Sequence, residues 1–349
     1  MAALIRKEGL TFDDVLLLPR ASAVEPRSAF LETLAAKKFP LKLPLISSPM
    51  DRVTGARMAI AIGKLGGLGV IHRNCTIEEQ VAMVIEAKKV GVIVGAACGP
   101  FAVDRALALE KAGADFVSID CAHGHNVNVI ASAKKIKKQL KRAKLIFGNI
   151  ATAEAAKAVC GFADAVKVGI GPGSICTTRL VSGVGVPQLT AIMDVASIAK
   201  KKGVPVIADG GMRTSGDIAK ALAAGASAAM LGNVFAGTDE APGEIIERDG
   251  KKFKEYRGMG SKAVIESNSG AERYMTKGRK AVPEGVEALV RYRGPVAEIV
   301  AELASGLQVS FGYVGAKNIA EFQKKAEFIK VSHATLRENG PHSLAHLIG

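Results

Sequence analysis

Aromatic residues are scarce in this sequence: they make up 5% of its 349 residues, and tryptophan is absent. Proteins that bind single-stranded nucleic acids use aromatic side chains as platforms for base stacking, so this class is disfavoured. The sequence also lacks an apolar run long enough to span a membrane, and no apolar segment of signal-peptide length is present at its N-terminus. We therefore expect a cytoplasmic globular protein without a membrane partner.

Cysteine is also rare, and the five cysteines form no CxxC pair. An odd number of cysteines in a cytosolic chain argues against a disulfide framework and against a structural zinc site. Cys98 and Cys160 lie in apolar segments and are predicted to be buried filler, whereas Cys75 is ambiguous. If the chain has a reactive thiol, we expect it at one of the other cysteines.

Negative charge is in deficit, because 47 Lys and Arg face 33 Asp and Glu and give a formal charge of +14. This balance favours anionic ligands, either nucleotide phosphates or nucleic acid. Much of the excess lies in residues 134–142, where apolar residues recur at helical spacing. That pattern predicts a solvated helix face rather than an RNA site.

Eight short apolar runs alternate with Ala-rich helical segments. Strands buried on both faces and separated by helices pair in parallel through right-handed crossovers, and eight of them predict a closed (β/α)8 TIM barrel. We expect one catalytic domain over residues 1–349. The runs are 45–47, 69–71, 92–94, 116–119, 145–147, 165–168, 204–207 and 229–231.

Two long segments interrupt this repeat. Residues 169–203 separate the sixth and seventh runs, which predicts a functional loop there. Residues 237–294, rich in Gly, Lys, Glu and Arg, follow the eighth run and delay an amphipathic helix near residues 296–304. We interpret 237–294 as a mobile flap.

Glycines follow the seventh and eighth strands, as Asp209-Gly210-Gly211 and as Gly232-Asn233. These glycines could simply permit tight turns. Their position at the two strands that build phosphate sites in such barrels favours phosphate binding instead. Asp209 is suited to accept hydrogen bonds from ribose hydroxyls.

The loop after the sixth strand, residues 169–179, contains three glycines, Ser174 and Cys176. The glycines leave the backbone open, so that Cys176 can lie over the barrel mouth and backbone carbonyls can face a cation. Cys176 is the cysteine that lies in a flexible, basic setting where a thiolate is stabilised and accessible. It is our candidate nucleophile.

These motifs resemble those of the IMP dehydrogenase and GMP reductase family over nearly the whole chain. The resemblance implies that Cys176 attacks carbon 2 of the purine, that hydride passes to NAD+, and that the covalent adduct is hydrolysed to xanthosine monophosphate. It also implies a homotetramer. The matching segments are 10–17, 47–51, the Cys176 loop, 209–213, 256–261 and 336–338.

The resemblance also implies roles for individual residues. Those expected to bind the nucleotide are Ser48, Met50, Ser174, Asp209, Gly211, Gly232, Asn233, Tyr256, Gly258, Met259, Gly260 and Glu284. Those expected to contact NAD+ are Asp120, Asn149, Gly169 and Gly171. Carbonyls of Gly171, Gly173 and Cys176 are expected to hold K+, with Glu338 in the C-terminal segment that completes the cation site of a neighbouring subunit.

The flap distinguishes the two branches of the family. Dehydrogenases activate water with an Arg-Tyr pair, which Arg273 and Tyr274 match, whereas reductases need no such water. Thr178 and Glu284 offer a second proton route, since a hydroxyl and a carboxylate can pass a proton within hydrogen-bond reach. These residues favour a dehydrogenase that oxidises IMP with NAD+.

Three features depart from the family pattern. The first keeps a reductase, which converts GMP and NADPH to IMP and ammonia, as the alternative function. The other two weaken single residue assignments. Residues 77–94 run on without the CBS modules that most dehydrogenases carry, a trait shared with reductases. Asn233 stands where a serine is common, and residues 337–342 follow the family segment only loosely. A flavin-dependent barrel could use the same phosphate glycines.

Overall fold

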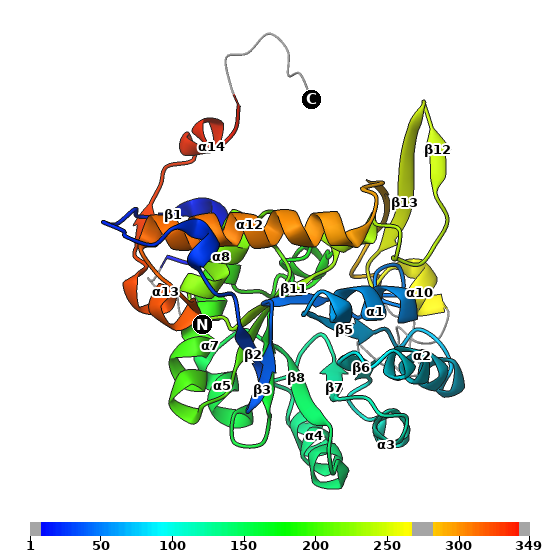
Figure 1. The fold of residues 1–349 in the computed structure, drawn as a ribbon. Helices are drawn as coiled ribbons and strands as arrows, with labels where there is room; N and C mark the ends of the chain where they lie inside the picture. The colour runs from blue at the N-terminus through cyan, green and yellow to red at the C-terminus, as the bar shows by residue number, and fades with distance from the viewer. Residues whose placement is uncertain (1–7, 267–281, 342–349) are drawn as a thin grey trace.

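The computed structural model describes residues 8–266 and 282–341. Eight parallel strands form a closed barrel in the order β10-β11-β4-β5-β6-β7-β8-β9, which confirms the predicted (β/α)8 fold (Figure 1). The barrel strands are β4 (Leu45–Ser47), β5 (Leu68–Ile71), β6 (Val94–Cys98), β7 (Phe116–Asp120), β8 (Lys144–Ile150), β9 (Ala165–Val168), β10 (Val206–Asp209) and β11 (Ala228–Leu231). Strands β6 and β10 begin two residues later than predicted.

Helices surround the barrel, and several begin at a capping side chain. Thr76 and Glu79 form a capping box at α2, and Asn126 caps α4, so backbone N–H groups at these helix ends are satisfied. The outer helices are α1 (Ala56–Lys64), α2 (Ile77–Lys89), α3 (Val103–Lys111), α4 (Val127–Gln139), α5 (Ala153–Val159), α7 (Gln188–Ala199), α8 (Ser215–Ala223) and α12 (Val296–Val314).

Helix α4 carries the lysine-rich stretch. It buries Val129, Ala133 and Ile136 against the barrel, while Lys134 and Lys135 are exposed. This agrees with the predicted solvated helix face, because the apolar positions recur at helical spacing.

A short hairpin closes the N-terminal end of the barrel, which we call the floor. Strands β2 (Thr33–Ala36) and β3 (Phe39–Leu41) pair in antiparallel fashion, and their residues Ala35, Ala36 and Leu41 are buried in one cluster with Phe116. The ring of Phe39 meets that of Phe116 edge-on with centroids 4.5 Å apart.

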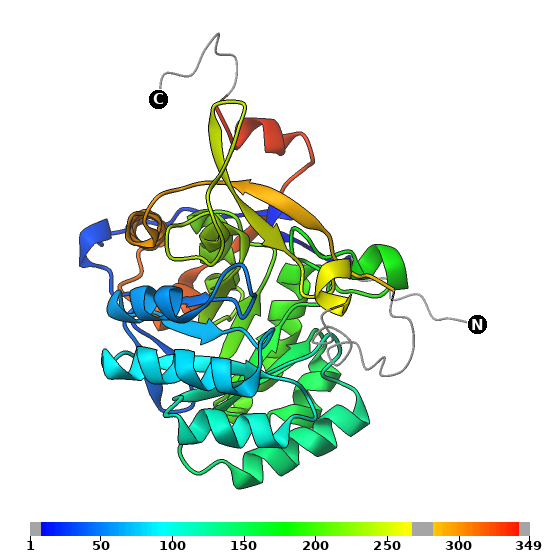
Figure 2. The same ribbon diagram turned by 90° about the vertical axis from the view of Figure 1, so that its right-hand side faces the viewer.

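The segment after β11 builds a small antiparallel sheet, β12-β13-β14, whose first hairpin projects away from the barrel (Figure 2). Its elements are α9 (Asn233–Ala236), β12 (Ile246–Arg248), β13 (Lys251–Arg257), α10 (Lys262–Glu266) and β14 (Glu287–Arg291). This segment is the predicted flap, and its mobility stays a prediction. Arg273 and Tyr274 lie outside the described residues.

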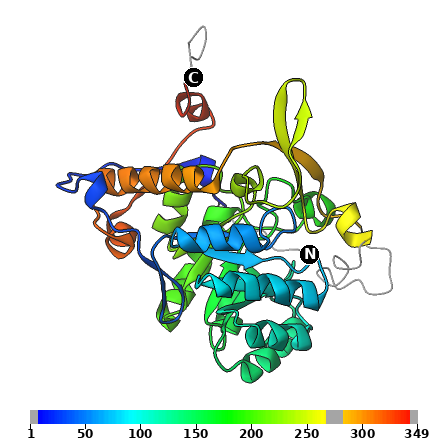
Figure 3. The same cartoon turned by 45° about the vertical axis from the view of Figure 1, so that its right-hand side comes forward.

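The remaining elements lie outside the barrel or in its loops. In Figures 1 and 3, α12 crosses one end of the molecule and α14 stands clear of the barrel. Strands β1 (Val15–Leu17) and β15 (Phe328–Lys330) pair antiparallel. The others are α6 (Thr178–Ser182), α13 (Ile319–Lys325), α14 (Thr335–Glu338) and the 3-10 helices Phe12–Asp14, Pro26–Ser28 and Lys200–Lys202.

In the part of the chain that the structure describes, no single helix combines the length and apolarity needed to cross a membrane; α12 and α13 meet those criteria only when taken together, across a 46° bend.

Candidate active site

The carboxyl ends of the barrel strands surround an open cavity of about 850 Å³, which we call the mouth. The structure brings most of the predicted site residues to it. They are Ser48, Met50, Asp120, Asn149, Gly169, Gly171, Gly173, Cys176, Thr178, Asp209, Gly232, Tyr256, Gly258, Met259, Gly260 and Glu284. The predicted residues Ser174, Gly211 and Asn233 line an adjoining cavity that shares Gly232 and Tyr256 with the mouth.

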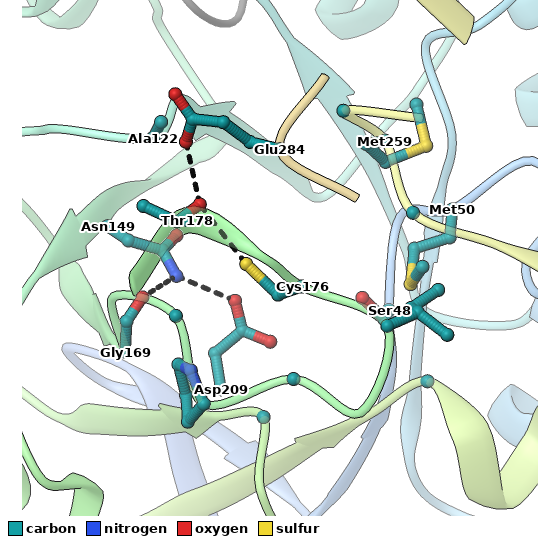
Figure 4. A pocket seen from close by; sticks show the side chains of 18 of the residues that line it. Ser48, Met50, Ala122, Asn149, Gly169, Cys176, Thr178, Asp209, Met259 and Glu284 are labelled. Atoms are coloured by element: carbon teal, nitrogen blue, oxygen red, sulfur yellow. Dashed lines mark hydrogen bonds between the residues drawn. The ribbon is translucent and has the colours of Figure 1, made fainter. Parts of the chain in front are cut away.

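Cys176 is half-buried in the loop after β9, at one end of a hydrogen-bond chain. Its thiol donates to Thr178 Oγ1 at 3.2 Å, and the Thr178 hydroxyl donates to Glu284 Oε2 at 2.7 Å (Figure 4). The chain leads from the thiol through a hydroxyl to a carboxylate, so a proton leaving the sulfur has an acceptor two hydrogen bonds away.

Backbone hydrogen bonds fix the relative positions of the segments that carry Cys176, Thr178 and Glu284. The Thr177 N–H donates to the Glu284 carbonyl and the Val286 N–H donates to the Ile175 carbonyl, each at 3.0 Å. The Glu284 N–H in turn donates to the Gly260 carbonyl at 3.0 Å. The cysteine loop, residues 284–286 and the predicted nucleotide-binding loop at 258–260 are therefore one connected unit.

Arg179 braces the cysteine loop from behind. Its guanidinium donates to the Ile170 carbonyl at 3.1 Å through Nε and to the Val186 carbonyl at 2.7 Å through Nη2. Gly171 packs against the Arg179 side chain, and a Cβ at this position would lie 2.6 Å from Arg179 Cγ. The backbone φ of Gly171 is 78°. Only glycine meets both conditions.

The carbonyls predicted to hold a cation lie in this braced loop. The Gly173 carbonyl accepts the Cys176 N–H at 3.1 Å and keeps a second lone pair for another partner. Glu338 lies on α14, which stands clear of the barrel (Figure 1). Within residues 8–266 and 282–341, no group of three His, Cys, Asp or Glu side chains is placed to hold a metal ion.

A buried polar cluster lies beneath the cavity, where β7, β8, β9 and β10 end. Lys167 Nζ lies 3.1 Å from Asp120 Oδ1 and 2.9 Å from Asp209 Oδ2, and it also donates to Asn149 Oδ1. Asn149 Nδ2 donates to the Gly169 carbonyl at 2.7 Å and to Asp209 Oδ2 at 2.9 Å (Figure 4). Lys167 was not among the site residues predicted from the sequence, although a lysine inside a run of buried β-strand residues was a signal.

Tyr256 closes the side of the mouth toward the predicted phosphate glycines. It is 4% exposed, and burial raises the pKa of its hydroxyl. That hydroxyl is hydrogen-bonded with Ser174 and lies 3.7 Å from Met50 Sδ. A Cβ on Gly232 would lie 2.7 Å from the Tyr256 hydroxyl, so the close approach requires glycine at this position.

Asp51 ties the flap to the barrel at the end of β13. Arg257 Nε lies 3.0 Å from Asp51 Oδ2, and Asn74 Nδ2 donates to the same oxygen at 2.6 Å. Burial opposes ionisation of Asp51, but the hydrogen bonds from Arg257 and Asn74 prevail and lower its pKa. This pairing could not be predicted from the sequence, because its partners lie 206 residues apart.

The other cysteines are poorly suited to act as nucleophiles. Cys98 and Cys160 are buried, as predicted. Cys121 is buried beside the mouth, and burial raises the pKa of its thiol to about 11. Cys75 is half-buried, and burial raises its thiol pKa as well. Cys176 is thus the cysteine that combines access to the cavity with a proton acceptor chain.

Fold and site together define an α/β-barrel enzyme whose cavity at the carboxyl ends of the strands is lined by a half-buried cysteine. The family model of the IMP dehydrogenase / GMP reductase domain matches residues 9–342, and the chain belongs to this family. The resemblance seen in the sequence is confirmed.

Relatives named inosine-5'-monophosphate dehydrogenase align over nearly the full chain. That of Methanocaldococcus jannaschii is 40% identical over 476 aligned positions, which cover 97% of this chain and 96% of the relative. That of Cryptosporidium parvum is 42% identical over 384 positions, with the same coverage. That of Borreliella burgdorferi is 41% identical over 396 positions, covering 97% of this chain and 98% of the relative.

Proposed function

We propose that the protein oxidises IMP to xanthosine monophosphate with NAD+ and water, as an IMP dehydrogenase. The observation that carries the proposal is the chain from Cys176 through Thr178 to Glu284 at the barrel mouth. Relatives 36–42% identical to this chain carry the name inosine-5'-monophosphate dehydrogenase, which supports the dehydrogenase branch over the reductase branch.

In the first step, the Cys176 sulfur bonds to carbon 2 of the bound purine, and its proton leaves through Thr178 toward Glu284. NAD+ supplies the acceptor for the hydride that departs from this carbon. Asp120, Asn149 and Gly169 line the mouth and are proposed to face the dinucleotide, because their oxygens can accept hydrogen bonds from ribose hydroxyls.

In the second step, water attacks carbon 2, the carbon–sulfur bond breaks, and the thiol is restored as xanthosine monophosphate leaves. Arg273 and Tyr274 are proposed to activate this water, with Thr178 and Glu284 as a second route for its proton. The purine is held by the unit that joins residues 258–260 to 284–286. The phosphate fits the adjoining cavity, where Ser174, Gly211, Gly232 and Asn233 lie.

The carbonyls of Gly171, Gly173 and Cys176 are proposed to hold K+, with Glu338 supplied by a neighbouring copy in a homotetramer. The position of α14, clear of its own barrel, supports this exchange (Figure 1). We also propose that the chain is a single cytoplasmic catalytic domain without CBS modules. Residues 90–93 form the whole connection between α2 and β6, where the modules would be inserted. The alignment with the M. jannaschii relative spans 476 positions, more than the residues of this chain, so that relative carries inserted residues that this chain lacks.

The test is the appearance of NADH absorbance when purified protein is mixed with IMP, NAD+ and K+. We expect turnover by the wild type and a fall of at least about a thousandfold in Cys176→Ala. Cys160→Ala, which removes a buried thiol far from the mouth, is the matched control and should retain activity. Consumption of NADPH with GMP, without NADH production from IMP, would instead assign the protein to the reductase branch.

A further inference from the structure

Lys167 occupies an unusual place for a lysine, in the middle of barrel strand β9 with 1% of its surface exposed. Its neighbours in the strand are Ala165, Val166 and Val168, all fully buried. An ammonium group is costly to bury unless several acceptors surround it. The role of Lys167 can therefore be inferred from the acceptors that surround its ammonium group.

The ammonium reaches three side chains from three different strands. It lies 2.9 Å from Asp209 Oδ2 on β10 and 3.1 Å from Asp120 Oδ1 on β7, and it donates to Asn149 Oδ1 on β8. A lysine has three N–H donors, so these contacts can use all of them. The contact to Asn149 also fixes its amide, because Oδ1 accepts from Lys167 while Nδ2 donates to Asp209.

These three side chains belong to different halves of the site proposed above. Asp209 lies on the side of the nucleotide ribose, whereas Asp120 and Asn149 lie on the side of the dinucleotide. We propose that Lys167 is a positioning residue that sets both ribose-binding carboxylates with one buried charge, and thereby the relative placement of the two ligands. This inference rests on the proposed function.

Loss of the ammonium should affect both halves at once. Without it, two carboxylates converge on a buried space, and such a pair takes up a proton at a higher pH than an isolated carboxylate does. A protonated carboxyl group is a weaker acceptor for a ribose hydroxyl. The acidic limb of the pH profile of kcat/KM should therefore move to higher pH in a variant that lacks the charge.

The experiment compares Lys167→Met, Lys167→Arg and Lys254→Met in the full chain. Lys254 is the matched control, since it is 2% exposed and its ammonium donates to the backbone carbonyls of Thr238 and Ala241. Calorimetry gives the Kd of IMP alone, and steady-state rates give the KM of NAD+ and the pH profile. Alkylation of Cys176 by iodoacetamide reports on the cysteine loop.

We expect Lys167→Met to raise the Kd of IMP and the KM of NAD+ by at least about tenfold each. Lys167→Arg should recover part of both, Lys254→Met should leave both within about twofold, and Cys176 should be alkylated at the wild-type rate in all variants. The proposal is overturned if Lys167→Met weakens one ligand only, or if Lys254→Met weakens both equally. A wild type that neither binds nor oxidises IMP would refute the proposed function instead.

Discussion

At the floor of the barrel, Phe39, Phe116 and Leu41 belong to one apolar cluster, whereas at the mouth a lysine, two aspartates and an asparagine meet below the cavity. One barrel strand joins the two groups: Phe116 begins β7 and Asp120 ends it, four residues along. Apolar contacts at the floor stabilise the fold but do not depend on the orientation of the groups involved. Hydrogen bonds at the mouth are directional, so they can fix the positions of the side chains that bind ligands.

The largest stability effect should follow a change at the floor. Phe116→Ala removes a fully buried ring that packs on Phe39, and it should lower the free energy of unfolding by about 3–5 kcal/mol. Denaturant unfolding measures this loss. The KM values should not change, because the mouth lies at the opposite end of the strands. Phe30→Ala is the control, since Phe30 is 66% exposed and its truncation should cost less than about 0.5 kcal/mol.

A smaller effect, on rate rather than stability, should follow a change at the mouth. Glu284→Gln keeps a hydrogen-bond acceptor for Thr178 but cannot take up a proton, so turnover should fall by about tenfold to a hundredfold. Steady-state kinetics and thermal unfolding together separate the two effects. Glu287→Gln, an exposed change on β14, should leave the rate intact; an equal loss in both variants would contradict a proton route through Glu284.

The smallest effect concerns His72, which follows β5 beside the Asp51–Arg257 pair. Burial lowers the pKa of His72 below its ordinary value of 6.5, partly offset by the charge of Asp51. The unfolded chain therefore binds a proton at His72 more readily, and stability should fall as pH drops below about 6.5. His72→Gln should reduce this pH dependence when melting temperatures are compared near neutral pH and near pH 5. An unchanged dependence would show that other groups cause it.

The floor and the mouth also differ in how far the sequence predicts them. The β-branched runs located the barrel strands because burial on both faces leaves a continuous apolar pattern. Cys176, Asp209 and the glycines at 210, 211 and 232 could be placed at the mouth and its adjoining cavity because they follow strand ends and match family motifs, whereas their roles stay predictions. The sequence also predicted that Thr178 and Glu284 lie within hydrogen-bond reach, and the Thr178 hydroxyl donates to Glu284 Oε2 at 2.7 Å.

Other features could not be predicted because they depend on contacts between distant segments. Lys167 reads as one polar residue in an apolar strand until β7, β8 and β10 supply its acceptors. Arg257 and Asp51 meet only because β13 folds back over the barrel. At the start of β6, the Val94 N–H donates to the Asp115 carboxylate at 2.9 Å, a contact between residues 21 positions apart. None of these pairings leaves a periodic pattern in the sequence.

The connection between α2 and β6 offers a place to splice additional sequence into this enzyme. Val90 is 46% exposed, and a Cβ on Gly91 would meet no atom within 4 Å. The connection lies at the floor end of the barrel, as every loop that leads from a helix into a barrel strand does, and so lies far from Cys176. A reporter or a sensing module spliced between Val90 and Val92 would therefore leave the chain free to close its barrel around an unaltered mouth.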